Sequence, residues 1–211
     1  MPYEVDYIPV GDGEKAGDAI ALRETVGSML EEAQRLNDLI DSLLVLARIE
    51  GGRSPLYLEP VRLDELISEI SDNVSVLATE KGQTIELADQ SEVSVSADRL
   101  LLRHAVMNIL HNAIRYSPPA TKVLLRSFRQ DTHAIIEIAD EGPGIAPEHH
   151  QKIFERFYRI DKARSHAEGG TGLGLSIAKL SIEQFGGSIE LESEVEKGSR
   201  FRIILPAQRD E

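Results

Sequence analysis

Apolar residues recur every three or four positions along residues 22–50 of the chain. Leu36 and Leu43 belong to this apolar stripe, and acidic or other polar residues fill most positions between its members. The spacing predicts one long amphipathic helix that ends near Gly51. A stripe this wide needs an apolar partner. Either it packs against the rest of its own domain, or it belongs to a helical hairpin or an intersubunit bundle.

Beyond the GGRSP linker, the pattern switches between strand and helix periods. A short strand leads to a helix over 65–81 with Asp64 as its N-cap, and two strands follow. A helix over 99–117 with Asp98 as its N-cap precedes two more strands. After a glycine-bearing stretch with a short helical piece around HHQKIFERFYRI, the chain predicts a helix over 173–186 and a closing hairpin. Paired strands with intervening helices indicate an α+β fold, a two-layer α/β sandwich in which helices cover one face of a mixed sheet.

These patterns divide the chain into three predicted parts. Residues 1–20 carry glycines among acidic residues and form an atypical N-terminal segment without a sustained helical pattern. Residues 21–52 contain the long helix, and residues 57–211 form the main domain.

Composition narrows the classes of function. The chain of 211 residues has 23 Lys or Arg and 36 Asp or Glu, a formal net charge of −13. This balance argues against broad binding of nucleic acid or anionic membrane, which needs many cationic contacts on one face. The absence of cysteine excludes disulfides, thiolate zinc sites and cysteine nucleophiles. No window approaches the ~20 consecutive apolar residues of a membrane span, and no secretory signal is visible, so we expect a soluble piece.

Two of the motifs offer neutral or acidic oxygens. Asn108 and Asn112 lie four residues apart, so both carboxamides share one helix face, and their oxygens suit a hard cation such as Mg²⁺. Asp140 ends an apolar strand and precedes Gly142 and Gly144. A carboxylate there can accept from an exocyclic amine, as on adenine, while glycines let the backbone approach a flat base. Taken singly, these motifs are more typical of a polar helix surface and of a tight turn with a solvated aspartate.

Two further motifs suit phosphate. GGTGLGL at 169–175 opens a helix, and the N–H groups of a first helical turn bind anions. Residues 152–164, here called the lid, contain FERFYR and hold five basic against two acidic side chains. In so acidic a chain, this reversal of charge indicates either an anionic ligand or a neighbouring acidic surface. A basic lid that closes over a triphosphate fits the motif order better.

The ordered set NxxxNAxRY, DxGPG, FERFYR and GTGLGL, closed by the strand GSRFRIILP, resembles the ATP-binding catalytic domain of sensor histidine kinases. The wider family includes gyrase B, Hsp90 and MutL, and the resemblance covers about residues 57–211. Residues 22–50 resemble the second helix of the histidine kinase dimerisation hairpin. The first hairpin helix carries the phosphoacceptor histidine in a motif of the type SHELRTP. No such motif is found here, and the first histidine of the chain is His104.

The resemblance implies a role for each matching residue. Asn112 is the implied Mg²⁺ ligand, and the implied catalytic residues are Asn108, Asn112, Arg115 and Arg159. The implied ATP contacts come from all four motifs: Asn108, Asn112, Arg115, Tyr116, Asp140, Gly142, Gly144, Ile145, Arg159, Gly170, Thr171, Gly172, Leu173, Gly174 and Leu175. Phe154 and Phe157 are expected to anchor the lid to the core.

The resemblance also implies cofactors, partners and a location. ATP and Mg²⁺ are the cofactors, and the acceptor histidine lies on a dimerisation domain, in cis in the parent protein or in trans. A response regulator receiver domain then takes the phosphoryl group. The expected parent is a homodimeric, membrane-anchored sensor with this domain in the cytoplasm. Two alternatives stay open: a non-catalytic nucleotide-binding interaction module, and another ATPase or serine kinase of the superfamily. The glycine loop and Asn108 favour the histidine kinase branch, since a gyrase-like ATPase has a water-activating glutamate at that place.

Overall fold

The computed structural model describes most of the main domain and part of the preceding helix. The described residues are 25–27, 29, 33, 36, 39–40, 42–49, 56–160 and 171–208. The chain divides into two compact units, Met1–Asp41 and Ser42–Glu211. Every described position between 25 and 49 is helical, as the stripe predicts, whereas the prediction for residues 1–20 lies outside the described residues. No helix among the described residues is long and apolar enough to cross a membrane.

Five strands form the main sheet, in the order β2-β4-β5-β7-β6. Their bounds are Thr84–Gln90 for β2, Lys122–Gln130 for β4, His133–Asp140 for β5, Ser188–Glu194 for β6 and Gly198–Pro206 for β7. β2 runs parallel to β4, and the other neighbouring pairs are antiparallel. The sheet is therefore mixed, as predicted. β1 (Glu59–Arg62) and β3 (Ser94–Ala97) pair separately in a two-stranded sheet.

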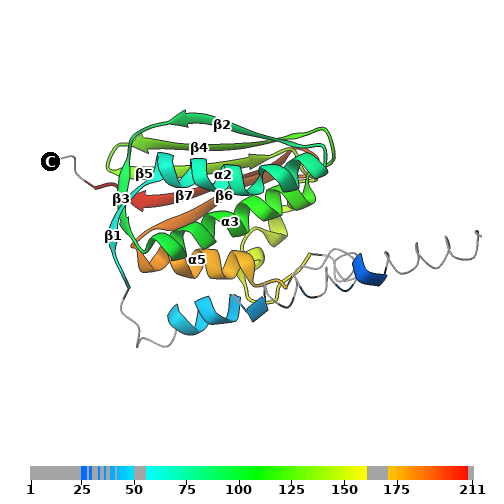
Figure 1. Cartoon of the computed structure of the whole chain (residues 1–211), viewed down its shortest axis with the longest axis horizontal. Coiled ribbons are helices and arrows are strands. Elements are labelled where there is room, and N and C mark those ends of the chain that lie inside the picture. Colours follow the sequence, from blue (N-terminus) through cyan, green and yellow to red (C-terminus); the bar gives the residue numbers. More distant parts are fainter. Residues whose placement is uncertain are drawn as a thin grey trace, which may run out of the picture. The chain divides into compact units, whose positions relative to one another are not determined.

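Three helices cover one face of the main sheet (Figure 1). They are α2 (Leu63–Glu80), α3 (Arg99–Tyr116) and α5 (Gly174–Gln184). Leu66, Ile109 and Ile136 are fully buried and come from α2, α3 and β5 respectively. Burying such side chains stabilises the fold by about 1.5–3 kcal/mol each, so the apolar periodicity selects this layer arrangement. The predicted two-layer α+β sandwich is confirmed.

One of the two predicted helix caps is wrong. The Asp98 carboxylate accepts from the backbone N–H of Leu101 at 3.2 Å and caps α3 as expected. α2 begins two residues earlier than predicted because Leu63 is fully buried in the core. Asp64 thus lies inside the first turn, where its carboxylate pairs with Arg62 instead of capping the helix.

The helical piece predicted around HHQKIFERFYRI forms only in part. The structure has two 3-10 turns, η1 (Pro147–His149) and η2 (Lys152–Phe154). The chain cannot continue as a helix beyond η2, because Phe157 has a φ of 62° in the left-handed region.

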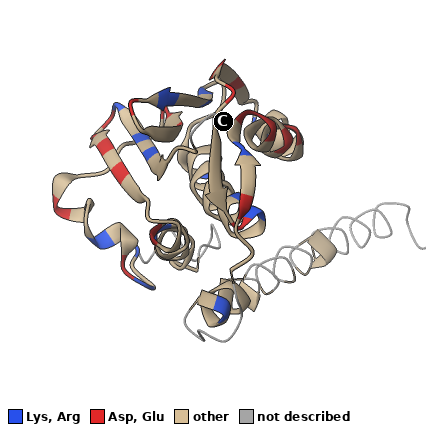
Figure 2. Ribbon diagram, turned by 90° about the vertical axis from the view of Figure 1, so that its left-hand side faces the viewer, with Lys and Arg blue, Asp and Glu red and all other residues tan. Residues whose placement is uncertain are grey.

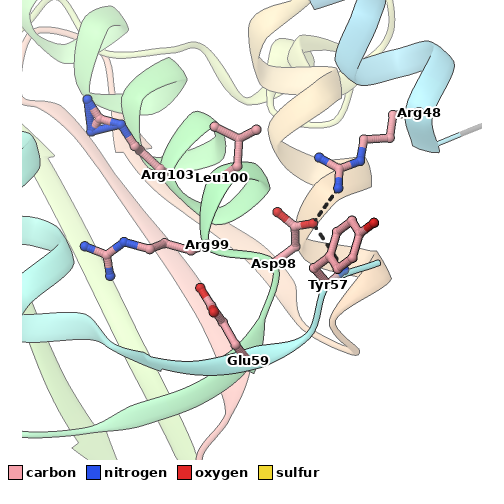
Figure 3. Close-up of a pocket in the computed structure, with 7 residues that line it drawn as sticks. All are labelled: Arg48, Tyr57, Glu59, Asp98, Arg99, Leu100 and Arg103. Carbon is pink, nitrogen blue, oxygen red and sulfur yellow. Dashed lines mark hydrogen bonds and ion pairs between the residues drawn. The ribbon is translucent and has the colours of Figure 1, made fainter. Parts of the chain in front are cut away.

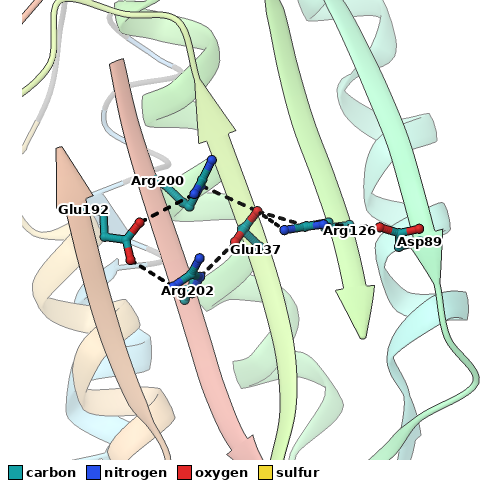
Figure 4. A network of polar contacts seen from close by, with 6 residues as sticks. All are labelled: Asp89, Arg126, Glu137, Glu192, Arg200 and Arg202. Carbon is teal, nitrogen blue, oxygen red and sulfur yellow. Dashed lines mark hydrogen bonds and ion pairs between the residues drawn. The ribbon is translucent and has the colours of Figure 1, made fainter. Parts of the chain in front are cut away.

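Charged residues cross the sheet on the face opposite the helices (Figure 4). Glu137 on β5 is fully buried and accepts from Arg126 Nε at 2.9 Å and Arg202 Nε at 2.8 Å. Arg200 Nε lies 3.7 Å from the same carboxylate. These arginines stand on β4 and β7, so a single carboxylate ties the three central strands together. Figure 2 colours the charged residues on the ribbon, and those of α2 and β6 are all acidic.

Candidate functional site

The last two turns of α3 carry four of the predicted site residues. Asn108, Asn112 and Arg115 are half-buried, and the Tyr116 side chain is 48% exposed. The Arg115 guanidinium lies 5.8 Å from the centroid of the Tyr116 ring. The opposite side of α3 is fully buried, including Ile109. The apolar side thus fixes the helix on the sheet and leaves both carboxamides at the border of the core.

Two side chains from the turn after α2 hold the carboxyl end of α3. Lys81 Nζ donates to the carbonyls of Ile114 at 2.9 Å and Arg115 at 2.7 Å. The buried Gln83 amide donates to the carbonyls of Ile114 at 3.0 Å and Ser117 at 2.7 Å. A cation and an amide donor at this end satisfy the free carbonyls of the last turn. The site residues of α3 therefore sit on a firmly capped helix end.

Asp140 is a half-buried acceptor at the end of β5. Its carboxylate accepts from Gly142 N at 2.8 Å and from the backbone N–H of Ser199. Burial raises the pKa of Asp140, and these two hydrogen bonds oppose the shift without cancelling it. A Cβ on Gly142 would lie 2.7 Å from Asp140 Oδ1 and 3.4 Å from the carbonyl oxygen of Tyr116. A side chain at this position would therefore displace the Asp140 carboxylate, which glycine leaves in place beside the end of α3.

The hairpin between β6 and β7 packs against the loop that follows Asp140. A Cβ on Gly144 would lie 2.0 Å from the carbonyl oxygen of Glu194, and a Cβ on Gly198 would lie 1.9 Å from that of Asp140. Both glycines have positive φ, 67° and 88°. No other residue fits at either position without moving the backbone, so the loop and the hairpin form one interlocked unit.

Two serines that no motif predicted complete this unit. The Ile145 N–H donates to Ser193 Oγ at 2.8 Å, and Ser193 Oγ lies 3.1 Å from Ser199 Oγ. Ser193 follows Ile189 and Leu191 in the alternating pattern of β6 and thus occupies the inward phase of that strand. A polar residue in the inward phase of an apolar strand is the sequence signal that would have found it.

The glycine loop brings the start of α5 against α3. A Cβ on Gly174 would lie 3.0 Å from Asn108 Oδ1, so the absence of a side chain permits this approach. Within the described residues, no side chain caps the first turn of α5. Leu173 at the cap position is fully buried, and Leu175 in that turn is half-buried. Thr171 Oγ1 accepts from Leu173 N at 3.3 Å. The predicted residue Gly170 lies outside the described residues.

Backbone contacts join the lid to the glycine loop. Phe157 N donates to the Gly172 carbonyl at 2.9 Å, and a Cβ on Gly172 would lie 2.9 Å from Phe157 Cα. The Phe154 ring packs edge-on against Phe201 with centroids 6.5 Å apart, so its predicted anchoring role is confirmed. The prediction for the Phe157 ring is wrong: this side chain is 65% exposed because the left-handed backbone turns it outward.

Arg159 is the one arginine of the lid that was predicted as a site residue. The residue is half-buried, and its Nη2 atom is buried without a hydrogen-bond partner among the described residues. Burying an unpaired nitrogen of a cation is unfavourable, so an anionic group would improve this environment.

A cavity of about 440 Å³ lies at the opposite, amino-terminal end of α3 (Figure 3). Arg48 reaches across it, and its Nη2 atom lies 3.0 Å from Asp98 Oδ2. The lining residues are Arg48, Tyr57, Glu59, Asp98, Arg99, Leu100 and Arg103. None of the predicted site residues lines this cavity, so it is separate from the motif cluster.

Comparison with known proteins agrees with this arrangement. Residues 97–209 match a family model described as histidine kinase-, DNA gyrase B- and HSP90-like ATPase. The chain belongs to this family. The matched range begins just before α3 and contains all four motifs, and it ends after β7.

Several proteins similar to this chain are named as sensor histidine kinases. The sensor-like histidine kinase SenX3 of Mycolicibacterium smegmatis is 36% identical over 195 residues, 92% of this chain and 51% of SenX3. The chain thus spans about half the length of this relative. The crystal structure of ShkA in complex with AMPPNP matches with a TM-score of 0.76 at 30% identity, over 89% of this chain and 39% of ShkA. The mycobacterial sensor histidine kinase MprB matches with a TM-score of 0.62 at 30% identity, over 72% of this chain and 99% of that structure. The predicted histidine kinase catalytic domain is confirmed.

Proposed function

We propose that this site binds Mg²⁺-ATP and delivers the γ-phosphoryl group to a histidine imidazole on a dimerisation domain. The observation that carries the proposal is the contact between Asn108 on α3 and Gly174 at the start of α5. It brings carboxamides, which ligate hard cations, beside an uncapped helix start, which binds phosphate. Family membership and the order of the motifs also support binding of Mg²⁺-ATP.

The adenine end of the site follows from Asp140. Its half-buried carboxylate would accept from the exocyclic amine of adenine. Gly142 and Gly144 would leave the base room against the backbone, and Ile145 would line the pocket. Tyr116 would lie against the nucleotide, since its carbonyl oxygen neighbours Gly142. Burial of the acceptor strengthens each hydrogen bond that it accepts.

The phosphate end follows from the start of α5 and from two arginines. The N–H groups from Gly172 to Leu175 would cradle phosphate oxygens, together with Thr171. Arg115 would contact phosphate from α3, and Arg159 would bring its unpaired Nη2 to the γ-phosphate. Gly170, which lies outside the described residues, would belong to the same phosphate cradle.

Mg²⁺ fits the donors on α3. No group of three or more His, Cys, Asp or Glu side chains within the described residues could hold a metal ion, so the protein would supply few charged ligands. Mg²⁺ commonly keeps waters and substrate phosphates in its coordination shell and needs few protein ligands. Asn112 would be the protein ligand here, with Asn108 beside it. When bound, the ion neutralises phosphate charge. Transfer then depends on how the residues of the chain position the groups.

The wider assembly follows from the family. Residues 21–52 would contribute the second helix of a dimerisation hairpin in a homodimeric parent, with 1–20 as a separate segment and 57–211 as the catalytic domain. The exposed Leu43 and Leu44 suit such a partner helix. A response regulator receiver domain would take the phosphoryl group from the histidine, and the catalytic domain would face the cytoplasm of a membrane-anchored sensor.

Two experiments test the proposal in sequence. Calorimetric titration with Mg²⁺ and AMPPNP should show binding, and Asn112→Ala should weaken it. Asn73→Ala, which changes an exposed asparagine on α2, serves as the matched control and should bind like the wild type. A folded wild type that binds no nucleotide would contradict the proposal.

The second experiment supplies the acceptor. The chain is mixed with a histidine-containing dimerisation domain and γ-labelled ATP, and acid-labile label on the histidine is the expected result. Nucleotide binding without any transfer would favour the alternative of a non-catalytic interaction module. Label on serine, or release of phosphate without label, would favour a serine kinase or another ATPase of the family.

A further inference from the structure

Three polar side chains form one row across the end of the sheet. In the strand register, Asp140 on β5 is paired with Ser199 on β7, and Ser199 is paired with Ser193 on β6. Residues paired across antiparallel strands point to the same face. In β7 this face also carries the buried Phe201, so the row lies on the helix-covered side of the sheet. The row ends where the chain leaves β5 for the loop that carries Gly142.

The hydrogen bonds of Ser193 determine where its proton lies. Ser193 Oγ accepts from Ile145 N at 2.8 Å and lies 2.9 Å from the carbonyl oxygen of Gly198. A carbonyl oxygen only accepts, so the single hydroxyl proton of Ser193 is given to Gly198. The remaining contact, 3.1 Å to Ser199 Oγ, then requires Ser199 to donate. Ser193 therefore has all its hydrogen-bonding capacity in use.

These hydrogen bonds determine the orientation of the Ser199 hydroxyl. This residue is 8% exposed, its backbone N–H donates to the Asp140 carboxylate, and its hydroxyl proton is directed to Ser193. Its remaining lone pairs can only accept. The Asp140 carboxylate, when ionised, also only accepts. The polar end of the base pocket is thus an acceptor surface, which pairs with an amine and is mismatched with a carbonyl oxygen.

We propose that Ser193 is a specificity-determining residue of the nucleotide site, which orients the Ser199 hydroxyl so that the pocket selects a 6-amino purine over a 6-oxo purine. Ser193 acts through Ser199 and through the N–H of Ile145, and is a positioning residue without its own contact to the base. The proposal rests on the proposed function, since it assumes that the base lies beside Asp140. Discrimination arises because a buried polar group without its partner is unfavourable.

The test compares two nucleotides that differ at the purine 6-position. Mg²⁺-ADP carries an amine there and Mg²⁺-IDP a carbonyl, and neither is turned over during a calorimetric titration. The measured quantity is the ratio of their dissociation constants for the wild type, Ser193→Ala, Ser193→Thr and Ser188→Ala. Ser188 is an exposed serine on the same strand and provides the matched control.

In Ser193→Ala the Ser199 hydroxyl is free to rotate and to donate to a carbonyl. We expect the preference for ADP over IDP to narrow by about tenfold, which corresponds to one buried hydrogen bond. Ser193→Thr keeps the hydroxyl and should keep the preference, and Ser188→Ala should match the wild type. Thermal unfolding of each variant without nucleotide verifies that it is folded.

An unchanged ratio in Ser193→Ala would overturn the proposal. This includes the case in which both nucleotides lose affinity equally, which would show a purely structural role. Failure of the proposed function has a different signature, since the wild type itself would then bind neither nucleotide.

Discussion

Replacing Asp140 with asparagine removes the charge of the proposed base pocket and one of the two acceptor oxygens of this side chain. The carboxylate already accepts from two backbone N–H groups, those of Gly142 and Ser199. The single oxygen of asparagine can serve these donors, but little capacity remains for the adenine amine. A hydrogen bond to a charged group contributes about 1.5–3 kcal/mol, so affinity for Mg²⁺-AMPPNP should fall by about 10- to 150-fold.

The assay is calorimetric titration of wild type and Asp140→Asn at pH 7. Glu141→Gln makes the same chemical change one residue further along, at an exposed side chain, and should leave the affinity unchanged. If Asp140→Asn binds within about twofold of the wild type, adenine does not depend on this carboxylate, and the base pocket is assigned to the wrong place.

The same variant tests the electrostatics of the unliganded protein. Because burial raises the pKa of Asp140, the folded protein holds this proton more tightly than the unfolded chain does. The stabilisation linked to it is fully present below the ordinary pKa of 3.8 and is lost as the pH rises through the raised pKa. At pH 7 the ionised group therefore opposes folding. We expect the midpoint of thermal unfolding of unliganded Asp140→Asn not to fall below that of the wild type at pH 7. A clear drop would show that the two hydrogen bonds outweigh burial.

Three further predictions concern other positions. Glu137→Ala leaves the surrounding arginines without their shared carboxylate and should lower the free energy of unfolding by about 3 kcal/mol in urea denaturation. Glu190→Ala, a change at an exposed glutamate on β6, should stay within about 0.5 kcal/mol. Gly198→Ala forces a Cβ to within 1.9 Å of the Asp140 carbonyl oxygen, so we expect both lower stability and loss of nucleotide binding in the same titration. Asp98→Ala removes the cap of α3 and should cost about 1 kcal/mol of unfolding free energy, whereas Asp98→Asn keeps the cap and loses only the ion pair. Equal losses in the two variants would contradict the cap assignment.

The sequence determined which elements form and which residues are candidates for the chemistry. The periodicity of α2, α3 and α5 and the alternation of β4 to β7 follow from the need to bury one face of each element, a local property of spacing. The Asp98 cap and the closing hairpin with Gly198 could be predicted for the same reason. Each satisfies a requirement of the backbone that arises within a few residues. The four motifs pointed to the family because their order along the chain is itself information.

The tertiary structure decided what depends on distant partners. The start of α2 at Leu63 was set by burial in the core and not by the capping preference of Asp64, because burying a leucine outweighs one cap. The strand order, with β7 between β5 and β6, brought Ser193 and Ser199 into one row with Asp140, although about fifty residues separate them in sequence. No local pattern encodes such a row. Hydrogen bonding between strands depends on register, and register becomes fixed only when the whole sheet buries its apolar face.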